Sequence, residues 1–436
     1  MKVALLYPEV YDMARYRQER KEFPPFGVLY LAAVAEEAGH QVAIHRVAPG
    51  HTALNLASFD AVGFSLASSA TYGLMLQARR DATINPDALV MVGGVHANFY
   101  PAESLKDFTA DVVADGESED TILELLDRAD DRDFSTVAGV LFERDGQIVR
   151  NVPRPLMRDI DTLPLPARHL LPVDDIVLRD RLAGTNTRMA HVMFSRGCPF
   201  PCSFCAVAQR RMQYRGGVSA RTELTHLIDT YGIEGFAIVD DNFIVNKDKV
   251  TDICHHITDL GLRWSALSRV DTVDQPLLNT MAASGCIEIK YGMESGSERL
   301  LKAMRKNTTQ AKIRAAVEMT AKAGIQAKVF IIHGFPGENT ETTRETIGLL
   351  RELRPTLGRV SLFRFVPLPG TEVYANALLH GIHGTHQQPG WDGDWTKFHI
   401  HHNERHWWGD ADAWAETERS YAELRAFVEG EWGPQG

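Results

Sequence analysis

The sequence predicts an α/β protein in which two series of strands and helices follow one another along the chain. Short apolar or β-branched runs alternate with amphipathic stretches over residues 1–135, and the alternation returns over 189–370. Polar residues rarely interrupt the apolar runs, so the strands are expected to be buried on both faces of parallel sheets. Residues 136–188 are expected to form a hairpin and a linker, and residues 371–436 differ in composition from both series.

The length and the net charge of the chain limit the classes of protein to which it can belong. The 436 residues are 44% hydrophobic and carry a net charge of −11, which suits two or three ordinary domains. No stretch approaches the roughly 18 apolar residues of a membrane span, and Pro8 ends the first apolar run too early for a secretory signal. We therefore expect a cytoplasmic protein without a membrane partner. Its acidic balance disfavours nucleic acid and suits a cationic small molecule.

The first series is expected to form a doubly wound parallel sheet, because its strands alternate with helices. Ligands of such sheets bind beyond the carboxyl ends of the strands, so the loops of interest are 65–71, 93–101 and 116–119. The expected strands are 3–7, 41–45, 61–66, 88–92 and 111–114, and the expected helices are 27–38, 71–80 and 119–127.

A hairpin and a linker are expected between the two series. Strands at 139–142 and 147–150 flank Asp145-Gly146, which is a typical two-residue hairpin turn. Five prolines then fall within residues 153–172, which is typical of a linker.

The second series predicts a sheet that is either open or curled into part of a barrel. Chemistry on such a sheet is expected at the carboxyl ends of its strands. The expected strands are 191–195, 235–239, 264–268, 287–291, 327–332 and 360–366, and the expected helices are 220–230, 248–259, 275–283, 310–323 and 340–353.

Three of the five cysteines lie on one loop directly after the first strand of the second series. Cys198, Cys202 and Cys205 offer three thiolates, which leaves one metal position open. A cubane iron-sulfur cluster held in this way keeps one iron free to bind a ligand, whereas a structural zinc normally takes four protein ligands. A zinc completed by a distant histidine and simple buried cysteines are the alternatives. Cys254 and Cys286 stand alone and are expected in the core.

The C-x3-C-x2-C spacing, with Phe204 before the third cysteine, resembles the radical S-adenosylmethionine (SAM) superfamily. The resemblance implies a partial (β/α)6 barrel with a [4Fe-4S] cluster on the three cysteines, and SAM bound at the open iron with Phe204 in the cofactor site. Reductive cleavage of SAM would give a 5′-deoxyadenosyl radical that abstracts hydrogen from the substrate. It also implies an electron donor of the flavodoxin or ferredoxin type, or a partner reductase.

The same resemblance assigns SAM contacts at the ends of later strands. Asp240 or the neighbouring Asp241 would accept from the methionine ammonium group, although either could instead cap the next helix. Arg269 would pair with the methionine carboxylate, with a structural salt bridge as the alternative. Glu294 and Ser295 would bind the ribose, and the turn at Gly334 would let the backbone approach adenine.

The N-terminal series resembles the cobalamin-binding domain that precedes many radical SAM enzymes. The resemblance rests on Phe-Pro-Pro-Phe-Gly at 23–27, Gly-Gly-Val-His at 93–96 and Gly-Glu-Ser-Glu at 116–119. Gly93 and Gly94 would let the backbone approach the corrin. The D-x-H-x-x-G motif that supplies a cobalt-binding histidine is absent. Cobalamin is therefore a candidate cofactor, and a domain that keeps the fold without it is the alternative.

Two reactions fit these resemblances. The absent histidine motif, the short chain and the acidic balance favour a cobalamin-independent dehydration of an aminoglycoside-type sugar diol, similar to the radical diol-dehydratases of apramycin-type pathways. Tyr214, Asp241 and His333 would then be the catalytic proton carriers. The alternative is a cobalamin-dependent methyltransferase of natural-product biosynthesis. A plain electron carrier is disfavoured, since it would need no ribose turn. The C-terminal segment is expected to cap the barrel mouth with aromatic and imidazole side chains.

Overall fold

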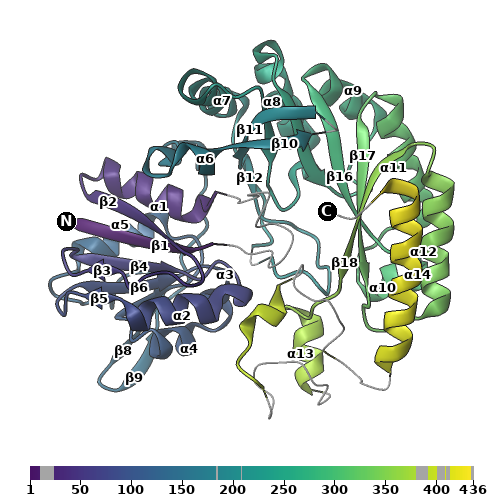
Figure 1. The fold of residues 1–436 in the computed structure, drawn as a ribbon. Helices are drawn as coiled ribbons and strands as arrows, with labels where there is room; N and C mark the ends of the chain where they lie inside the picture. Colours follow the sequence, from purple (N-terminus) through teal and green to yellow (C-terminus); the bar gives the residue numbers. More distant parts are fainter. Residues whose placement is uncertain are drawn as a thin grey trace. The chain divides into compact units, whose positions relative to one another are not determined.

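The computed structural model describes residues 1–9, 24–182, 185–207, 209–379, 391–399, 408 and 413–433. The chain divides into two compact units (Figure 1). The first contains Met1–Ile176 together with Asp392–His399, and the second contains Val177–Trp391 together with Ile400–Gly436.

The first unit is built on a seven-stranded sheet in the order β2-β1-β4-β6-β7-β8-β9. The pairs from β2 to β7 are parallel, as the doubly wound prediction requires, and β8 and β9 extend the sheet as an antiparallel hairpin. Strand β1 shows why this sheet is parallel and covered, since four consecutive side chains from Val3 to Leu6 are buried. The strands are β1 (Lys2–Pro8), β2 (Gln41–Val47), β4 (Ala61–Ser65), β6 (Leu89–Gly93), β7 (Val112–Ala114), β8 (Val140–Arg144) and β9 (Gln147–Arg150), beside a short pair, β3 (Asn55–Leu56) and β5 (Thr83–Ile84).

Helices and helical turns connect these strands. The helices of the first unit are α1 (Phe26–Glu37), α2 (Tyr72–Asp81), α3 (Val95–Phe99), α4 (Pro101–Asp107), α5 (Glu119–Asp127) and α6 (Val173–Ile176), with 3₁₀ turns at Ser69–Thr71, Ile160–Thr162 and Arg168–Leu170.

The second unit is built on a curved seven-stranded sheet in the order β10-β11-β14-β15-β16-β17-β18 (Figure 1). All pairs from β11 to β18 are parallel, which gives the six strands of the predicted partial barrel, while β10 is antiparallel at the edge. The strands are β10 (Val177–Leu182), β11 (Thr185–Val192), β14 (Gly235–Ile238), β15 (Arg263–Ser268), β16 (Cys286–Glu294), β17 (Gln326–His333) and β18 (Leu357–Arg364), beside a short ladder of β12 (Ser195–Arg196) and β13 (Gln213–Tyr214).

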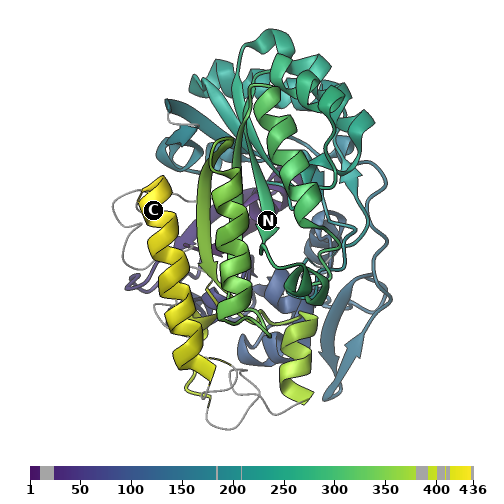
Figure 2. The ribbon, with the colours of Figure 1, turned by 90° about the vertical axis from the view of Figure 1, so that its right-hand side faces the viewer.

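Helices cover the outer side of this sheet (Figure 2). Strand β17 shows the alternation that results: Ala327, Val329, Ile331 and His333 are buried, whereas the residues between them are partly exposed. The helices are α7 (Gly217–Tyr231), α8 (Lys247–Ile257), α9 (Gln275–Ala283), α10 (Glu298–Ala303), α11 (Gln310–Lys322), α12 (Thr340–Leu353), α13 (Glu372–Leu379) and α14 (Trp414–Trp432), with 3₁₀ turns at Phe243–Val245 and Thr258–Leu260.

Two elements differ from the sequence prediction. Strand β10 lies where only linker was expected, because an edge strand pairs through its backbone and needs no apolar pattern in its sequence. The C-terminal segment is divided between the units: Asp392–His399 belongs to the first, while α14 packs beside α12 and β18 in the second (Figure 2). Helix α14 buries Ser420, Leu424 and Val428 at a spacing of four, so it covers the barrel wall. His401, His402 and His406 lie outside the described residues.

No helix in the described part of the chain combines the length and the apolar character needed to cross a membrane.

Candidate active site

The cysteine loop starts directly after β12 and is held by backbone contacts on both sides. The Cys198 N–H donates to the Gln209 carbonyl at 3.0 Å, and the Ser203 N–H donates to the Met304 carbonyl beyond α10 at 3.0 Å. Gly197 has φ +86°, and a Cβ there would lie 2.5 Å from the Arg211 carbonyl oxygen. Only glycine fits this turn, so the local sequence fixes where the three thiols begin.

The thiols lie in a poorly solvated environment. Burial raises the pKa of Cys202, against the opposing effect of Lys306 and Arg269, and burial also raises the pKa of Cys205 to about 11. Among the described residues, no three His, Cys, Asp or Glu side chains converge as a single metal ion would require. A cubane binds each thiolate at a different iron, so three cysteines need not share one centre. The donor set therefore fits a cluster better than a zinc ion.

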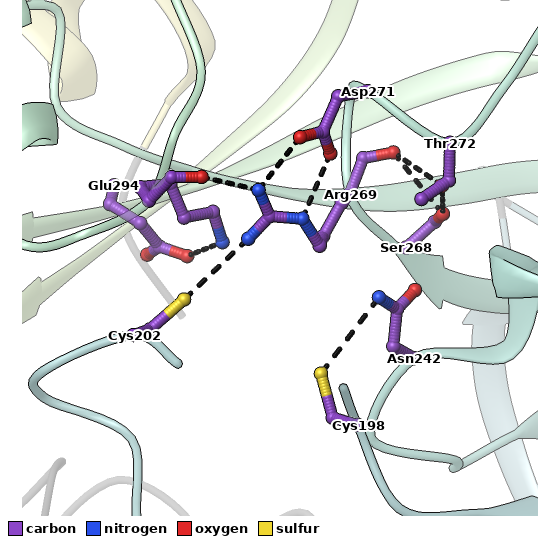
Figure 3. A network of polar contacts seen from close by, with 9 residues as sticks. Cys198, Cys202, Asn242, Ser268, Arg269, Asp271, Thr272 and Glu294 are labelled. Carbon is purple, nitrogen blue, oxygen red and sulfur yellow. Dashed lines mark hydrogen bonds and ion pairs between the residues drawn. The ribbon is translucent and has the colours of Figure 1, made fainter. Parts of the chain in front are cut away.

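Arg269 follows β15 and is fixed beside Cys202 on several sides (Figure 3). Its Nε and Nη2 donate to the two carboxylate oxygens of Asp271 at 2.8 Å each, and Nη2 also donates to the Lys306 carbonyl. Its Nη1 donates to Cys202 Sγ at 3.5 Å, and the guanidinium lies 3.9 Å from the ring centre of Phe200. The structure thus places Arg269 in the salt bridge that was the alternative assignment, and four of its five N–H groups are engaged.

Asn242 provides a second polar group at the cysteines, and its side-chain oxygen accepts no hydrogen bond from the described residues. Its Nδ2 lies 4.0 Å from Cys198 Sγ, at the end of the second parallel strand, β14 (Figure 3). The residue is buried, and its Oδ1 has no hydrogen-bond partner in the described part of the chain. A buried acceptor without a donor is costly, so this position fits a ligand that carries a donor. The ammonium group of SAM is such a donor.

The ribose turn predicted at Glu294 and Ser295 contains one charged pair and one structural hydroxyl. Glu294 has φ +64° at a bulge in β16, and its Oε1 accepts from Lys306 Nζ at 2.7 Å. A Cβ at Gly292 would come close to both Glu294 Oε1 and Lys306 Nζ, so any side chain there would displace the ends of these two side chains. The Ser295 hydroxyl lies 3.4 Å from Thr346 Oγ1 and accepts from the Ser297 N–H, which ties it to α12.

Asp240 braces the strand that leads into the cysteine loop. Its carboxylate accepts from the Phe194 N–H at 3.0 Å and from Ser195 Oγ at 2.6 Å, and burial raises its pKa to about 8. Both oxygens are used within the protein, so the structure does not present Asp240 to SAM. The neighbouring Asp241 is exposed, has no hydrogen bond or ion pair among the described residues, and contributes to the raised pKa of Cys205. Of the two candidates, Asp241 is therefore the carboxylate that a ligand could reach.

The other two predicted proton carriers have structural partners. The Tyr214 hydroxyl donates to the Phe243 carbonyl at 3.0 Å and accepts from the Asn246 N–H at 3.1 Å, so it braces the turn after β14. Burial raises the Tyr214 pKa to about 12. His333 Nε2 lies 3.3 Å from Thr343 Oγ1 of α12 and 3.1 Å from Ser420 Oγ of α14. Its imidazole therefore points from β17 to the helices outside the sheet, and its contacts there are not with the cysteines.

The turn after β17 carries a carboxylate that the sequence analysis did not assign. Glu338 Oε1 accepts from Thr342 Oγ1 at 2.8 Å, and Oε2 accepts from the Gly334 N–H at 3.3 Å. Burial outweighs these hydrogen bonds and raises its pKa to about 7. The Gly334 backbone, with φ +93°, is thus bound within its own turn.

Phe204 packs into an apolar cluster beside the cysteine loop. It contacts a buried group formed by α10, the turn after β17, the segment after β18 and the C-terminal segment. Its ring centre lies 6.0 Å from Lys306 Nζ. The members of the group are Leu300, Met304, Phe335, Phe365 and Trp408. Phe204 therefore anchors the cysteine loop against an apolar wall.

The predicted corrin loops lie at the carboxyl edge of the first unit's sheet. Gly94 has φ +104°, and a Cβ there would lie 2.8 Å from the Leu66 carbonyl oxygen, whereas a Cβ at Gly93 would make only ordinary contacts. The glycine at 94 is thus required by a close approach of two strand ends. His96 is fully buried, and its Nδ1 lies 2.8 Å from Ser69 Oγ in the loop 65–71.

The same edge carries exposed backbone and exposed apolar surface. A Cβ at Gly116 would meet no atom within 4 Å, and Val95 is 40% exposed although it is apolar. The loop over residues 65–71 at this edge carries mainly small side chains. Open backbone and exposed apolar surface fit a corrin held by backbone and shape.

Besides Glu338, three site residues were not found by sequence reasoning. Asp271 stands two residues after Arg269, a spacing that could have suggested the pair. Lys306 has no local signal, because its partner Glu294 lies on another element. Asn242 directly follows Asp240 and Asp241, to which the sequence analysis gave the role of binding the ammonium group.

The chain matches two protein families in adjacent regions. Residues 192–350 match the radical SAM superfamily, and residues 20–126 match the B12 binding domain. The first region contains the three cysteines and Glu294, and the second contains Gly93 and Gly94.

Related proteins cover most of the chain. The uncharacterized methyltransferase PH0819 of Pyrococcus horikoshii is 31% identical over 395 residues, which are 88% of this chain and 84% of that protein. The anaerobic magnesium-protoporphyrin IX monomethyl ester cyclase of Rubrivivax gelatinosus is 26% identical over 72% of this chain and 58% of its own length. The fold is similar to that of the radical SAM methyltransferase TsrM from Kitasatospora setae, with a TM-score of 0.71, 17% identity, and coverage of 98% of this chain and 88% of TsrM.

Proposed function

Since the chain belongs to the radical SAM superfamily and carries a B12 binding domain, we propose that it is a cobalamin-dependent methyltransferase that acts on a polar small molecule. The observation that carries the proposal is the presence, in one chain, of a three-cysteine loop and a B12 binding domain. A relative that covers 88% of this chain is named a methyltransferase. Another relative is named a cyclase, so the family alone does not specify the reaction.

Dehydration of a sugar diol is the reaction that the sequence analysis favoured, but neither of the two relatives described above nor TsrM is named for it. The relatives favour the alternative, methyl transfer. The chain is also not short for a cobalamin-type fold, since TsrM is covered over 88% of its length. Two of the three proton carriers that dehydration would use, Tyr214 and His333, hold structural contacts.

When bound, the cluster would supply one electron to SAM and cobalamin would act as a methyl carrier. Cys198, Cys202 and Cys205 would hold the cluster. Asn242 Oδ1 would accept a hydrogen bond from the SAM ammonium group, with the Asp241 carboxylate as a second acceptor. The apolar cluster around Phe204 would exclude water from the thiols.

The first unit would hold cobalamin through its loops. Gly94 and Gly116 would give the corrin access to backbone, and Val95 would provide apolar contact. His96 would take no part in cobalt binding, because it is buried against Ser69. This explains how the unit could bind the cofactor without a D-x-H-x-x-G motif.

The substrate and the electron donor are proposed by chemical class only. The net charge of −11 and the exposed carboxylate of Asp241 suit a cationic, polar natural product. The electron would come from a flavodoxin, a ferredoxin or a dedicated reductase.

Product analysis tests the proposal. The reconstituted, reduced protein would be incubated with SAM carrying a deuterated methyl group, with and without hydroxocobalamin. Methyl transfer leaves S-adenosylhomocysteine, whereas reductive cleavage leaves 5′-deoxyadenosine and methionine. We expect S-adenosylhomocysteine to form only with cobalamin, and the Cys202→Ala variant to form no 5′-deoxyadenosine. Formation of 5′-deoxyadenosine alone, at the same rate without cobalamin, would contradict methyl transfer.

A further inference from the structure

Arg269 is held so that one N–H group points at a thiol that would bind the cluster. Asp271 accepts from two of its nitrogens, the Lys306 carbonyl accepts from one of these, and the ring of Phe200 covers one face of the guanidinium. The residue is only 4% exposed. Rotation of the guanidinium would break all of these contacts together, so the direction of Nη1 toward Cys202 Sγ is fixed (Figure 3).

The charges around Cys202 are balanced in pairs. Arg269 is paired with Asp271 at 2.8 Å, and Lys306 is paired with Glu294 at 2.7 Å. All four side chains are largely buried, so their charges are weakly screened by solvent. Removal of the positive partner of a pair would leave an excess of negative charge near this sulfur, and removal of the negative partner would leave an excess of positive charge.

Such contacts act on electron transfer to an iron-sulfur cluster. Reduction adds one electron, taken from an external reductant, and neither breaks nor forms a bond to Arg269. Hydrogen bonds to the cysteine sulfur and nearby positive charge stabilise the more negative, reduced form and raise the reduction potential. Negative charge nearby has the opposite effect.

We propose that Arg269 is a positioning residue that raises the reduction potential of the cluster through its N–H contact with Cys202, and that Asp271 limits this effect by neutralising the guanidinium. The inference rests on the cluster and not on the methyl transfer proposed above. It assigns Arg269 a role different from binding the methionine carboxylate.

A purely structural role for the pair makes a different prediction. If Arg269 and Asp271 only join the loop after β15 to Lys306, removing either partner loosens the same contact, so both variants shift the potential in the same direction or not at all. If the charge acts on the cluster, the two variants shift it in opposite directions.

The test is a redox titration of the cluster followed by electron paramagnetic resonance, on reconstituted protein without SAM or cobalamin. We expect Arg269→Gln to lower the ratio of reduced to oxidised cluster about tenfold at a fixed potential, which is about 59 mV for one electron. We expect Asp271→Asn, which keeps the shape of the side chain, to raise the ratio by a similar factor. Arg221→Gln is the matched control, because Arg221 pairs with Asp259 at the exposed surface.

Iron and sulfide content would be measured first for each variant. If Arg269→Gln does not retain the cluster, the direction of the Asp271→Asn shift alone decides: an increase supports the proposal, and a decrease or no change overturns it. Shifts of the same sign in both variants, or loss of the cluster from both, would also overturn it. A failure of methyl transfer would leave this titration unaffected, so the two proposals can fail independently.

Discussion

Cys202 is the most buried of the three loop cysteines and the one that Arg269 contacts. Replacing it with alanine should remove one of three thiolates and abolish cluster binding, because each iron depends on its own ligand. We expect the iron content of the reconstituted Cys202→Ala variant to fall to background. Cys254→Ala is the control: this buried cysteine lies in α8, as a core residue should, and its variant should retain the iron. Full iron content in Cys202→Ala would contradict the assignment of the ligands.

Gly94 and Gly116 both have positive φ and differ in the space around them. A Cβ at Gly94 would lie 2.8 Å from the Leu66 carbonyl oxygen, and one at Gly116 would meet nothing within 4 Å. Gly116→Ala should therefore lower the free energy of unfolding by about 1 kcal/mol, because alanine is strained at a positive φ. Gly94→Ala should lower it by about 3 kcal/mol or more, because the clash with Leu66 adds to the same backbone strain. Thermal unfolding of the two variants gives the comparison. Equal losses would show that the close approach to Leu66 does not exist in solution.

At the residue scale, the sequence predicted the groups whose signal is local. The three cysteines occupy one short segment, so their spacing is visible without a fold. The spacing of Asp271 could have suggested a pair with Arg269, whereas the partner of Glu294, Lys306, has no local signal. The sequence does not show whether these partners or a cofactor bind the two side chains, because tertiary packing decides that competition. Asp240 shows the same effect, since its carboxylate is used by Phe194 and Ser195.

The junction between β17 and α12 should make stability depend on pH. The pKa of Glu338 rises from 4.5 to about 7 on burial. Between these values the folded protein keeps a proton on Glu338 that the unfolded chain has lost, so the contribution of Glu338 to stability falls as pH rises from 4.5 to about 7 and is level above. Asp240, whose pKa is about 8, adds a fall of its own over an overlapping range. Glu338→Gln should therefore make the fall in the free energy of unfolding between pH 4.5 and 7 smaller, as measured by denaturant unfolding across the range, whereas Glu341→Gln in the first turn of α12 should leave it unchanged. An unchanged pH profile in Glu338→Gln would contradict the raised pKa.

Three helices were predicted with the bounds that the structure shows. Helices α5, α9 and α12 begin and end where expected, and the side chains of Asp274 and Asn339 cap α9 and α12. Strand β10 was missed because an edge strand needs no apolar face. Helix α14 was missed because its buried side chains include Ser420, so the apolar stripe is incomplete.

The first unit is completed by a segment from near the end of the chain. The ring of Trp395 lies 4.7 Å from that of Tyr72 and 5.2 Å from that of His96. Trp395→Ala should lower the free energy of unfolding of the first unit by about 2 kcal/mol. This is less than the loss for a fully buried aromatic residue, because the indole is partly exposed. Hydrogen exchange at Ser69–Thr71 and α2 should become faster. Trp432→Ala, in α14 of the second unit, should leave exchange there unchanged, and equal effects of both variants would contradict the division of the chain.

The measurement that tests the central claim most directly is the iron and cobalt content per chain. The protein would be reconstituted anaerobically with iron, sulfide and hydroxocobalamin, and unbound corrin would be removed. A cobalamin-dependent radical SAM enzyme should retain about four irons and about one cobalt per chain. Iron without cobalt would contradict the methyltransferase proposal and would show that the first unit keeps the B12-binding fold without the cofactor.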